Sequence, residues 1–138
     1  MRRGIQNCVE CRLQEIVPLN QEGLEKNPHL TDLAGHLAES ALGYFFASIP
    51  NLDVAYFPER GAEPEVDFIL TVGTRRIPVE VKYRRHIDPH DDTRGLRAFL
   101  EKTVYNAPFG LLVTLNDDVR VSDPRIIPIS LSTLLWMK

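Results

Sequence analysis

The chain has 138 residues, of which 43% are hydrophobic and 25% charged, and its formal net charge is −3. This length and composition are typical of one globular domain with a buried core, and the net charge argues against a strongly basic nucleic-acid binder at the level of the whole chain. No apolar run approaches the roughly 20 residues of a membrane span and the N-terminus lacks a secretion signal, so we expect a cytoplasmic protein without a membrane partner.

Residues 1–29 show no regular hydrophobic period, and we interpret them as an irregular lead-in to a single domain over residues 30–138. Cys8 and Cys11 form one CxxC pair, whereas a structural zinc needs four ligands. His29 and His36 would complete the set, but their spacing matches no familiar zinc finger. Two reduced or buried cysteines are the default in a cytoplasmic chain.

The first predicted helix starts at an N-cap on Thr31 or Asp32 and runs to about Ser48, before Pro50. Glu39 lies at the edge of its apolar stripe, where a carboxylate can reach a neighbouring sheet. On periodicity alone, a solvated helix glutamate is the plainer interpretation. The stripe itself has helical spacing and consists of Leu33, Leu37, Ala41, Leu42, Phe45 and Phe46.

Three strands are predicted next. Residues 53–57 form a short strand that ends at Pro58, and residues 65–72 and 75–84 alternate apolar and polar side chains. Gly73-Thr74 lies between the last two strands and favours a type II′ hairpin turn.

This turn fixes which side chains face each other. If Val72 pairs with Arg75, then Asp67 lies opposite Glu80, and Lys82 shares the face of Glu80 at roughly 6.6 Å spacing. Directly opposed like charges destabilise a ladder, which makes a divalent metal a candidate partner for the two carboxylates. A turn longer by one residue would slip the register and leave an ordinary strand pair with a solvated face.

The same register puts Glu65 opposite Lys82, which predicts a cross-strand ion pair. From Arg75 to Lys102 the chain carries eight cations against five anions, an excess that could contact phosphate or only solvate the surface. Within this stretch, the loop HIDPHDD has metal-ligand side chains, yet acids before a helix are also ordinary N-terminal signals.

The C-terminal half continues with a helix over Thr93–Val104 and a nearly continuous apolar strand over Phe109–Leu115. Such a strand is typical of a sheet centre, and a right-handed crossover makes it parallel to the strand before it. Ile126–Ile129 predicts a last strand, and Ser130 or Ser132 can cap a final helix, whose exposed positions allow a homodimer. The predicted fold is α/β, with an α-β-β-β-α-β core and a mixed sheet flanked by helices.

Asp67, followed in the next strand by Glu80-Val81-Lys82, resembles the core motif of the PD-(D/E)XK nuclease superfamily. A closer resemblance is to the nuclease-like domain at the C-terminus of many prokaryotic AAA+-type ATPases, carried by the segments GHLAES, EVDFIL and PVEVKYR. The resemblance covers roughly Leu30 to Leu115 and departs from the family at Val66, where the family has proline. It implies a restriction-endonuclease-like fold.

The resemblance further implies a nuclease that hydrolyses phosphodiester bonds of nucleic acid, with DNA favoured, and an AAA+-type ATPase segment as partner. Asp67 and Glu80 would ligate Mg²⁺ or Mn²⁺, and Lys82 would orient the attacking water or stabilise developing charge. Glu39 matches the family's helix-borne acidic residue. The expected catalytic set is Glu39, Asp67, Glu80 and Lys82, with Arg84 and Arg85 following the phosphates.

A second hypothesis is a non-catalytic module that docks nucleic acid or protein for such an ATPase. Its carboxylates would then be satisfied by Lys82, Arg84 and Arg60. Because all four signature positions are intact in this sequence, we favour a competent metal site.

Overall fold

The computed structural model describes residues 28–137. The chain divides into two compact units, residues 1–34 and 35–138, and the fold below is that of the second unit. The predicted lead-in up to residue 27, with Cys8 and Cys11, lies outside the described residues.

The α/β fold predicted from the sequence is confirmed, with the order helix, three strands, helix, two strands, helix. The elements are α3 (Pro28–Ala47), β1 (Asp53–Phe57), β2 (Val66–Val72), β3 (Arg75–Lys82), α4 (Arg94–Leu100), the 3-10 turn η1 (Thr103–Tyr105), β4 (Gly110–Thr114), β5 (Ile126–Ser130) and α5 (Leu131–Trp136).

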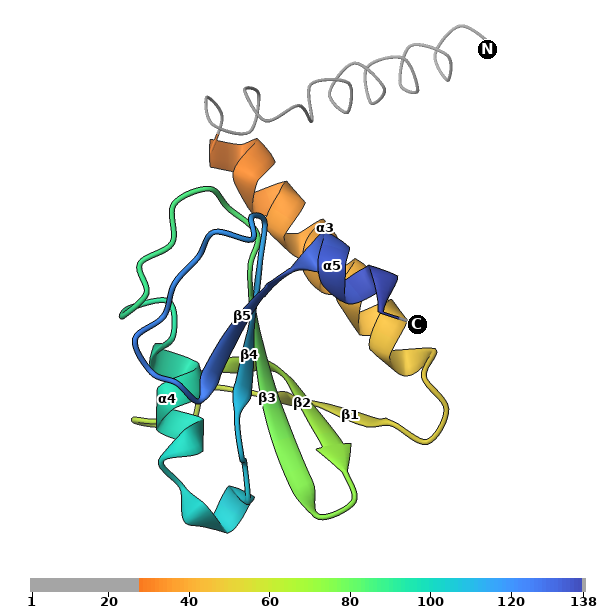
Figure 1. Ribbon diagram of the computed structural model, residues 1–138, viewed down its shortest axis with the longest axis vertical. Helices are drawn as coiled ribbons and strands as arrows, with labels where there is room; N and C mark the ends of the chain where they lie inside the picture. Colours follow the sequence, from red (N-terminus) through yellow and green to blue (C-terminus); the bar gives the residue numbers. More distant parts are fainter. Residues whose placement is uncertain (1–27, 138) are drawn as a thin grey trace, which may run out of the picture. The chain divides into compact units, whose positions relative to one another are not determined.

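The five strands form one mixed sheet in the order β1-β2-β3-β4-β5 (Figure 1). β2 is antiparallel to both β1 and β3, whereas β3, β4 and β5 run parallel to one another. The chain passes through α4 between β3 and β4, which is the crossover connection that parallel strands require. The predicted parallel pairing of the central apolar strand is therefore confirmed.

The hairpin between β2 and β3 has the predicted two-residue turn, because Val72 pairs with Arg75. Gly73 has φ of 62°, in the left-handed region that a glycine adopts at little cost and that a type II′ turn requires at its first central position. The register set by this turn continues without a slip to the pair Phe68 and Val79.

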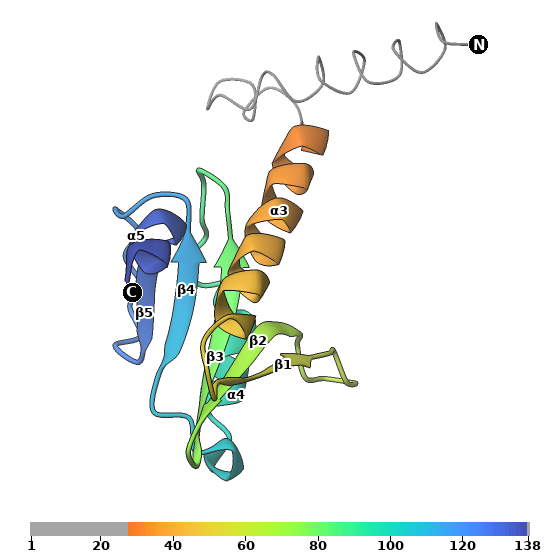
Figure 2. The same ribbon diagram turned by 90° about the vertical axis from the view of Figure 1, so that its right-hand side faces the viewer.

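Helices cover both faces of the sheet (Figures 1 and 2). On one face α3 and α5 pack on the strands through a cluster that includes Leu42, Phe46, Leu70, Val79, Val81, Val113, Leu131 and Leu134. On the other face α4 packs on a second cluster, formed by Val66, Ile69, Leu96, Phe99, Leu100, Leu112 and Ile126. β4 is thus buried on both faces, as its nearly continuous apolar sequence predicted, whereas β3, which was predicted to be half-buried, is buried from Pro78 to Val81.

Two predicted helix bounds are wrong. α3 is helical from Pro28, the first residue described, so Thr31 and Asp32 lie inside the helix instead of capping it. α4 ends at Leu100 and does not reach Val104.

The early end of α4 has a local cause. Lys102 adopts an extended backbone and Asn106 a left-handed one, so the chain between them forms only the 3-10 turn. This turn brings the ring of Tyr105 onto Phe99, with centroids 4.3 Å apart. The stacked pair closes the apolar cluster beneath α4.

The final helix is capped as predicted, since Thr133 N–H donates to Ser130 Oγ at 3.3 Å. No helix within residues 28–137 is long and apolar enough to cross a membrane.

Candidate functional site

The candidate site lies where the β2–β3 ladder stops. The last pair of the ladder is Phe68 with Val79, so Asp67 and Glu80 do not form the direct pair that we predicted. Instead, Asp67 Oδ2 accepts a hydrogen bond of 2.7 Å from Val81 N–H. A side-chain carboxylate thus satisfies a strand donor that would otherwise bond a backbone carbonyl.

A β-bulge in the neighbouring β1–β2 pairing lies beside the point where this ladder ends. Ala55 of β1 pairs with Ile69, and Phe57 pairs with Val66. Between these two pairs β2 therefore contains one residue more than β1. A bulge of this kind re-aims side chains and ends regular pairing. Here it lets both Asp67 and Phe68 line a hollow against α3.

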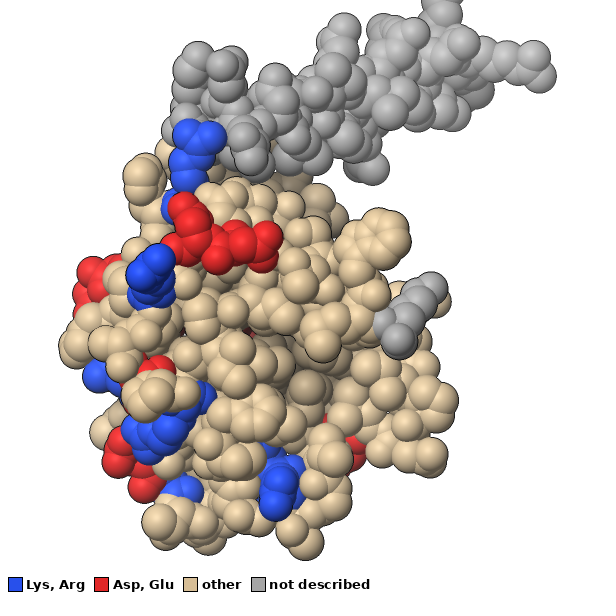
Figure 3. Space-filling view, viewed as in Figure 1, with Lys and Arg blue, Asp and Glu red and all other residues tan. Residues whose placement is uncertain are grey.

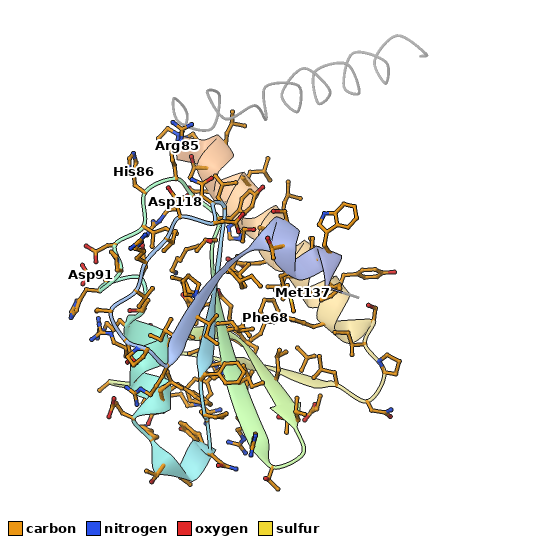
Figure 4. The ribbon with its side chains drawn as sticks, viewed as in Figure 1. Phe68, Arg85, His86, Asp91, Asp118 and Met137 are labelled. Carbon is orange, nitrogen blue, oxygen red and sulfur yellow. The ribbon has the colours of Figure 1, made fainter. Side chains whose placement is uncertain are left out.

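Phe68 closes the apolar side of that hollow. Its ring meets Phe46 of α3 edge-on, with centroids 5.7 Å apart, and the label in Figure 4 places it between the sheet and the helices. Gly43 faces the same ring so closely that an added Cβ would lie 3.3 Å from it. α3 therefore lies close to β2 at Phe68, the residue directly after Asp67.

Glu80 is the most deeply placed carboxylate of the site, with 8% of its surface exposed. Its Oε1 lies 2.6 Å from Lys82 Nζ, while its Oε2 is buried without a hydrogen-bond partner. Burial, and then the charge of Asp67, raise the pKa of Glu80 to about 7, although Lys82 acts in the opposite direction. The buried Oε2 therefore lacks a partner, a role that a proton or a cation could fill.

Lys82 stays an ammonium in this setting. Burial lowers the pKa of Lys82, but the charges of Glu80, Asp67 and Asp92 outweigh it, and the net direction is upward. The pKa of Asp67 is raised by burial, against the lowering effects of the Val81 N–H and of Lys82. Asp67 thus interacts with both other hairpin residues of the predicted set.

Glu39 joins the set from α3. Its side chain is 39% exposed, and its Oε2 lies 3.9 Å from His36 Nδ1. Partial burial, followed by the charge of Asp67, raises the pKa of Glu39. Glu39 and Asp67 line the same hollow, whose volume is about 600 Å³. The structure therefore brings Glu39 to the hairpin site, as the sequence resemblance implied.

Tyr44 and Tyr56 of the hollow were not singled out from the sequence, and Glu65, which also lines it, was assigned a different partner. A hydrogen bond with the Glu65 side chain raises the pKa of the Tyr56 hydroxyl. The predicted ion pair of Glu65 with Lys82 is wrong, because Lys82 pairs with Glu80. Helical spacing gave no signal for Tyr44, because it lies five residues after Glu39 and only residues three or four apart share a helix face.

Comparison with protein families assigns the chain. The model of a domain of unknown function, DUF4143, matches residues 34–133, which is most of the sequence. The chain belongs to the DUF4143 family. Comparisons with curated proteins and with solved structures gave no match. The DUF4143 match contains all four residues of the predicted catalytic set.

In the loop after β3 of this DUF4143 domain, the acidic side chains accept hydrogen bonds from the backbone of the loop itself. Asp88 accepts the N–H groups of His90 and Asp91 at 2.8 and 2.9 Å, and Asp92 accepts the Asp88 N–H at 2.9 Å. These bonds fold the loop on itself, which is the structural role that acids before a helix predicted.

Arg84 and Arg85 lie at the start of this loop. The Arg84 guanidinium bonds Asp92, and Arg85, labelled in Figure 4, also has an interaction partner. Contact of Arg84 with phosphate would require it to exchange Asp92 for the ligand. The structure thus places both arginines after the strand that carries Glu80 and Lys82, but engages them within the protein.

Only a few protein side chains at this site could ligate a metal ion. Among residues 28–137 there is no group of three or more His, Cys, Asp or Glu side chains arranged to hold a metal ion. Asp67 and Glu80 supply two carboxylates, and one buried oxygen of Glu80 has no partner. This suits Mg²⁺, which keeps several waters and takes one or two protein carboxylates.

Proposed function

We propose that this DUF4143 domain is a metal-dependent nuclease of the PD-(D/E)XK type, which hydrolyses phosphodiester bonds of nucleic acid with Mg²⁺ or Mn²⁺ as cofactor. The observation that carries the proposal is the buried, unpartnered Oε2 of Glu80 beside Asp67 and Lys82. Burying a carboxylate oxygen without a partner costs stability, and a cation bound there would recover that cost. The α-β-β-β-α-β order supports the same family resemblance.

In this proposal Asp67 and Glu80 hold the cation. When bound, it supplies a water of lowered pKa and offsets charge on the phosphate. Glu80 is half protonated near pH 7, so it must release its proton before it can ligate. Asp67 keeps one oxygen on the Val81 N–H, which fixes the orientation of its carboxylate.

Lys82 supplies the fixed positive charge. Its ammonium is held at the site by Glu80, and it can donate a hydrogen bond to the attacking water or to the phosphate as charge develops. Glu39 lines the hollow next to Asp67 and would position a further water or a second cation. Arg84 and Arg85 would contact the backbone phosphates. DNA as the nucleic acid and an AAA+-type ATPase segment as partner are parts of the same proposal, supported by the sequence resemblance.

The test is calorimetric titration of Mn²⁺ and Mg²⁺ at pH 8 into the wild type, Asp67→Asn and Asp88→Asn. We expect the wild type and Asp88→Asn to bind alike, because asparagine at position 88 keeps an acceptor for the loop N–H groups. Asp67→Asn removes a ligand charge and should weaken binding at least tenfold. Equal binding by Asp67→Asn and the wild type would overturn the metal site.

A docking module is the second candidate, and one observation favours it. The Glu80–Lys82 and Arg84–Asp92 pairs already neutralise charges of the hairpin and its loop without a metal. A folded wild type that binds neither Mn²⁺ nor Mg²⁺, alone or with nucleic acid, would move the assignment to this module.

A further inference from the structure

The hollow beside Asp67 has aromatic walls on two elements. Tyr44 projects from α3 with 81% of its surface exposed, and Tyr56 projects from β1 with 56% exposed. Large aromatic side chains this exposed contribute little to the core, so both rings are available to a ligand. They line the same hollow as Glu39 and Asp67.

The Tyr56 ring is held in place. Its hydroxyl is hydrogen-bonded to the Glu65 side chain, which starts the bulged stretch leading to Asp67. A ring fixed at its polar end loses little conformational freedom when something packs on its face. The bond thus prepares one wall of the hollow for stacking.

The lining of the hollow is acidic, so affinity for a nucleic acid there has to come from contacts other than cations along its backbone. No Lys or Arg lines this hollow among the residues that the structure describes, whereas Glu39, Glu65 and Asp67 do. On the face drawn in Figure 3, cations lie in separate groups beside acids and do not form a continuous stripe. Duplex binders depend on such cations, and single-strand binders use them as well, but a single strand also gains about 1–3 kcal/mol for each base that stacks on an aromatic ring, which this hollow offers.

We propose that the hollow takes an unpaired nucleotide, with its base against Tyr44 and Tyr56 and its phosphate at the cation that Asp67 would hold. The substrate class is therefore single-stranded nucleic acid or a duplex with an unpaired end, because bases inside a duplex have no free face. This inference rests on the proposed function and names the substrate of the same site.

The test measures binding of a fluorescent, phosphorothioate-linked single strand and of its duplex by anisotropy, with Mn²⁺ at pH 8. Wild type should bind the single strand more tightly than the duplex. Tyr44→Ala and Tyr56→Ala should each weaken single-strand binding by about 5- to 150-fold, the range for loss of one stacked base. Tyr44→Phe keeps its ring and should bind as the wild type does.

Trp136→Ala is the matched control, because Trp136 is an aromatic residue that is 86% exposed, close to the 81% of Tyr44, but does not line the hollow. It should leave binding unchanged. The inference is overturned if both alanine variants bind the single strand as the wild type does, if the wild type prefers the duplex, or if it binds neither. It is also overturned if the tyrosines prove necessary for binding of an arginine-rich peptide instead.

Manganese titrations of the same variants separate this inference from the proposed function. Normal Mn²⁺ binding by the tyrosine variants with unchanged single-strand affinity would remove the stacking site and leave the metal site standing. Absence of Mn²⁺ binding in the wild type, with the nucleic acid present, would remove both.

Discussion

At the scale of single residues, Asp67 is the centre of the site. Its carboxylate interacts with Glu39, Glu80 and Lys82, and it replaces a backbone acceptor for Val81 N–H. The residue that the sequence singled out as a metal ligand therefore also completes the hydrogen bonding of the hairpin. Asparagine at position 67 keeps an acceptor for that N–H, which makes it a better test than alanine.

Glu80 makes the metal-free protein sensitive to pH. Its pKa rises from 4.5 in the unfolded chain to about 7 in the fold, so between these values the native state binds a proton that the unfolded state does not. Stability from this group is full below about pH 4.5 and is lost as pH rises through 7, by up to about 3 kcal/mol. Glu80→Gln should flatten the fall in unfolding free energy between pH 5 and pH 8.

Urea unfolding at several pH values measures this slope. The slope is the quantity to compare, since Glu80→Gln also leaves Lys82 without its carboxylate partner and so lowers stability at every pH. An unchanged slope in Glu80→Gln would show that another group titrates in this range.

At the scale of elements, the sequence predicted the strands, the hairpin turn and the parallel crossover because alternation and a glycine turn are local signals. It did not predict the bulge, since nothing near Asp67 distinguishes a bulged strand from a regular one. The predicted β2–β3 register holds, but its ladder ends one pair short of Asp67 and Glu80, beside that bulge. The end of α4 was missed because tertiary stacking of Tyr105 on Phe99 overrides helical spacing.

The contact of α4 with the start of β2 is a second feature that spacing alone could not reveal. Gly95 lies so close to this strand that an added Cβ would be 2.5 Å from the backbone oxygen of Glu65. Gly95→Ala should therefore destabilise the domain by roughly 1 to 3 kcal/mol, as overpacking against backbone does.

Gly35→Ala is the matched control, because it also adds one methyl group within a helix but meets no atom within 4 Å. It should raise stability by about 0.5 to 1 kcal/mol through helix propensity. Urea unfolding of both variants measures these changes in unfolding free energy. A decrease of similar size in both variants would contradict a specific contact at Gly95.

At the scale of the whole molecule, the site lies where the β2–β3 ladder ends, in a mixed sheet whose two faces are both covered by helices. A cation that binds only the folded state stabilises the entire domain, by about 2.7 kcal/mol at 100 times its dissociation constant. Thermal unfolding with saturating Mn²⁺ at pH 8 should therefore shift the midpoint of the wild type upward by several degrees. Asp88→Asn should show the same gain, and Asp67→Asn none.

The pH dependence of this gain runs opposite to that of the metal-free protein. Below pH 7 a proton occupies Glu80 and competes with the metal, so at one fixed Mn²⁺ concentration the gain at pH 5.5 should be smaller than at pH 8. The metal-free domain loses the contribution of Glu80 over the same interval. Only a cation at Glu80 itself couples the two trends, since a metal held by the loop acids would leave the pH dependence of Glu80 unchanged. Equal gains at both pH values, or a full gain in Asp67→Asn, would place the metal elsewhere.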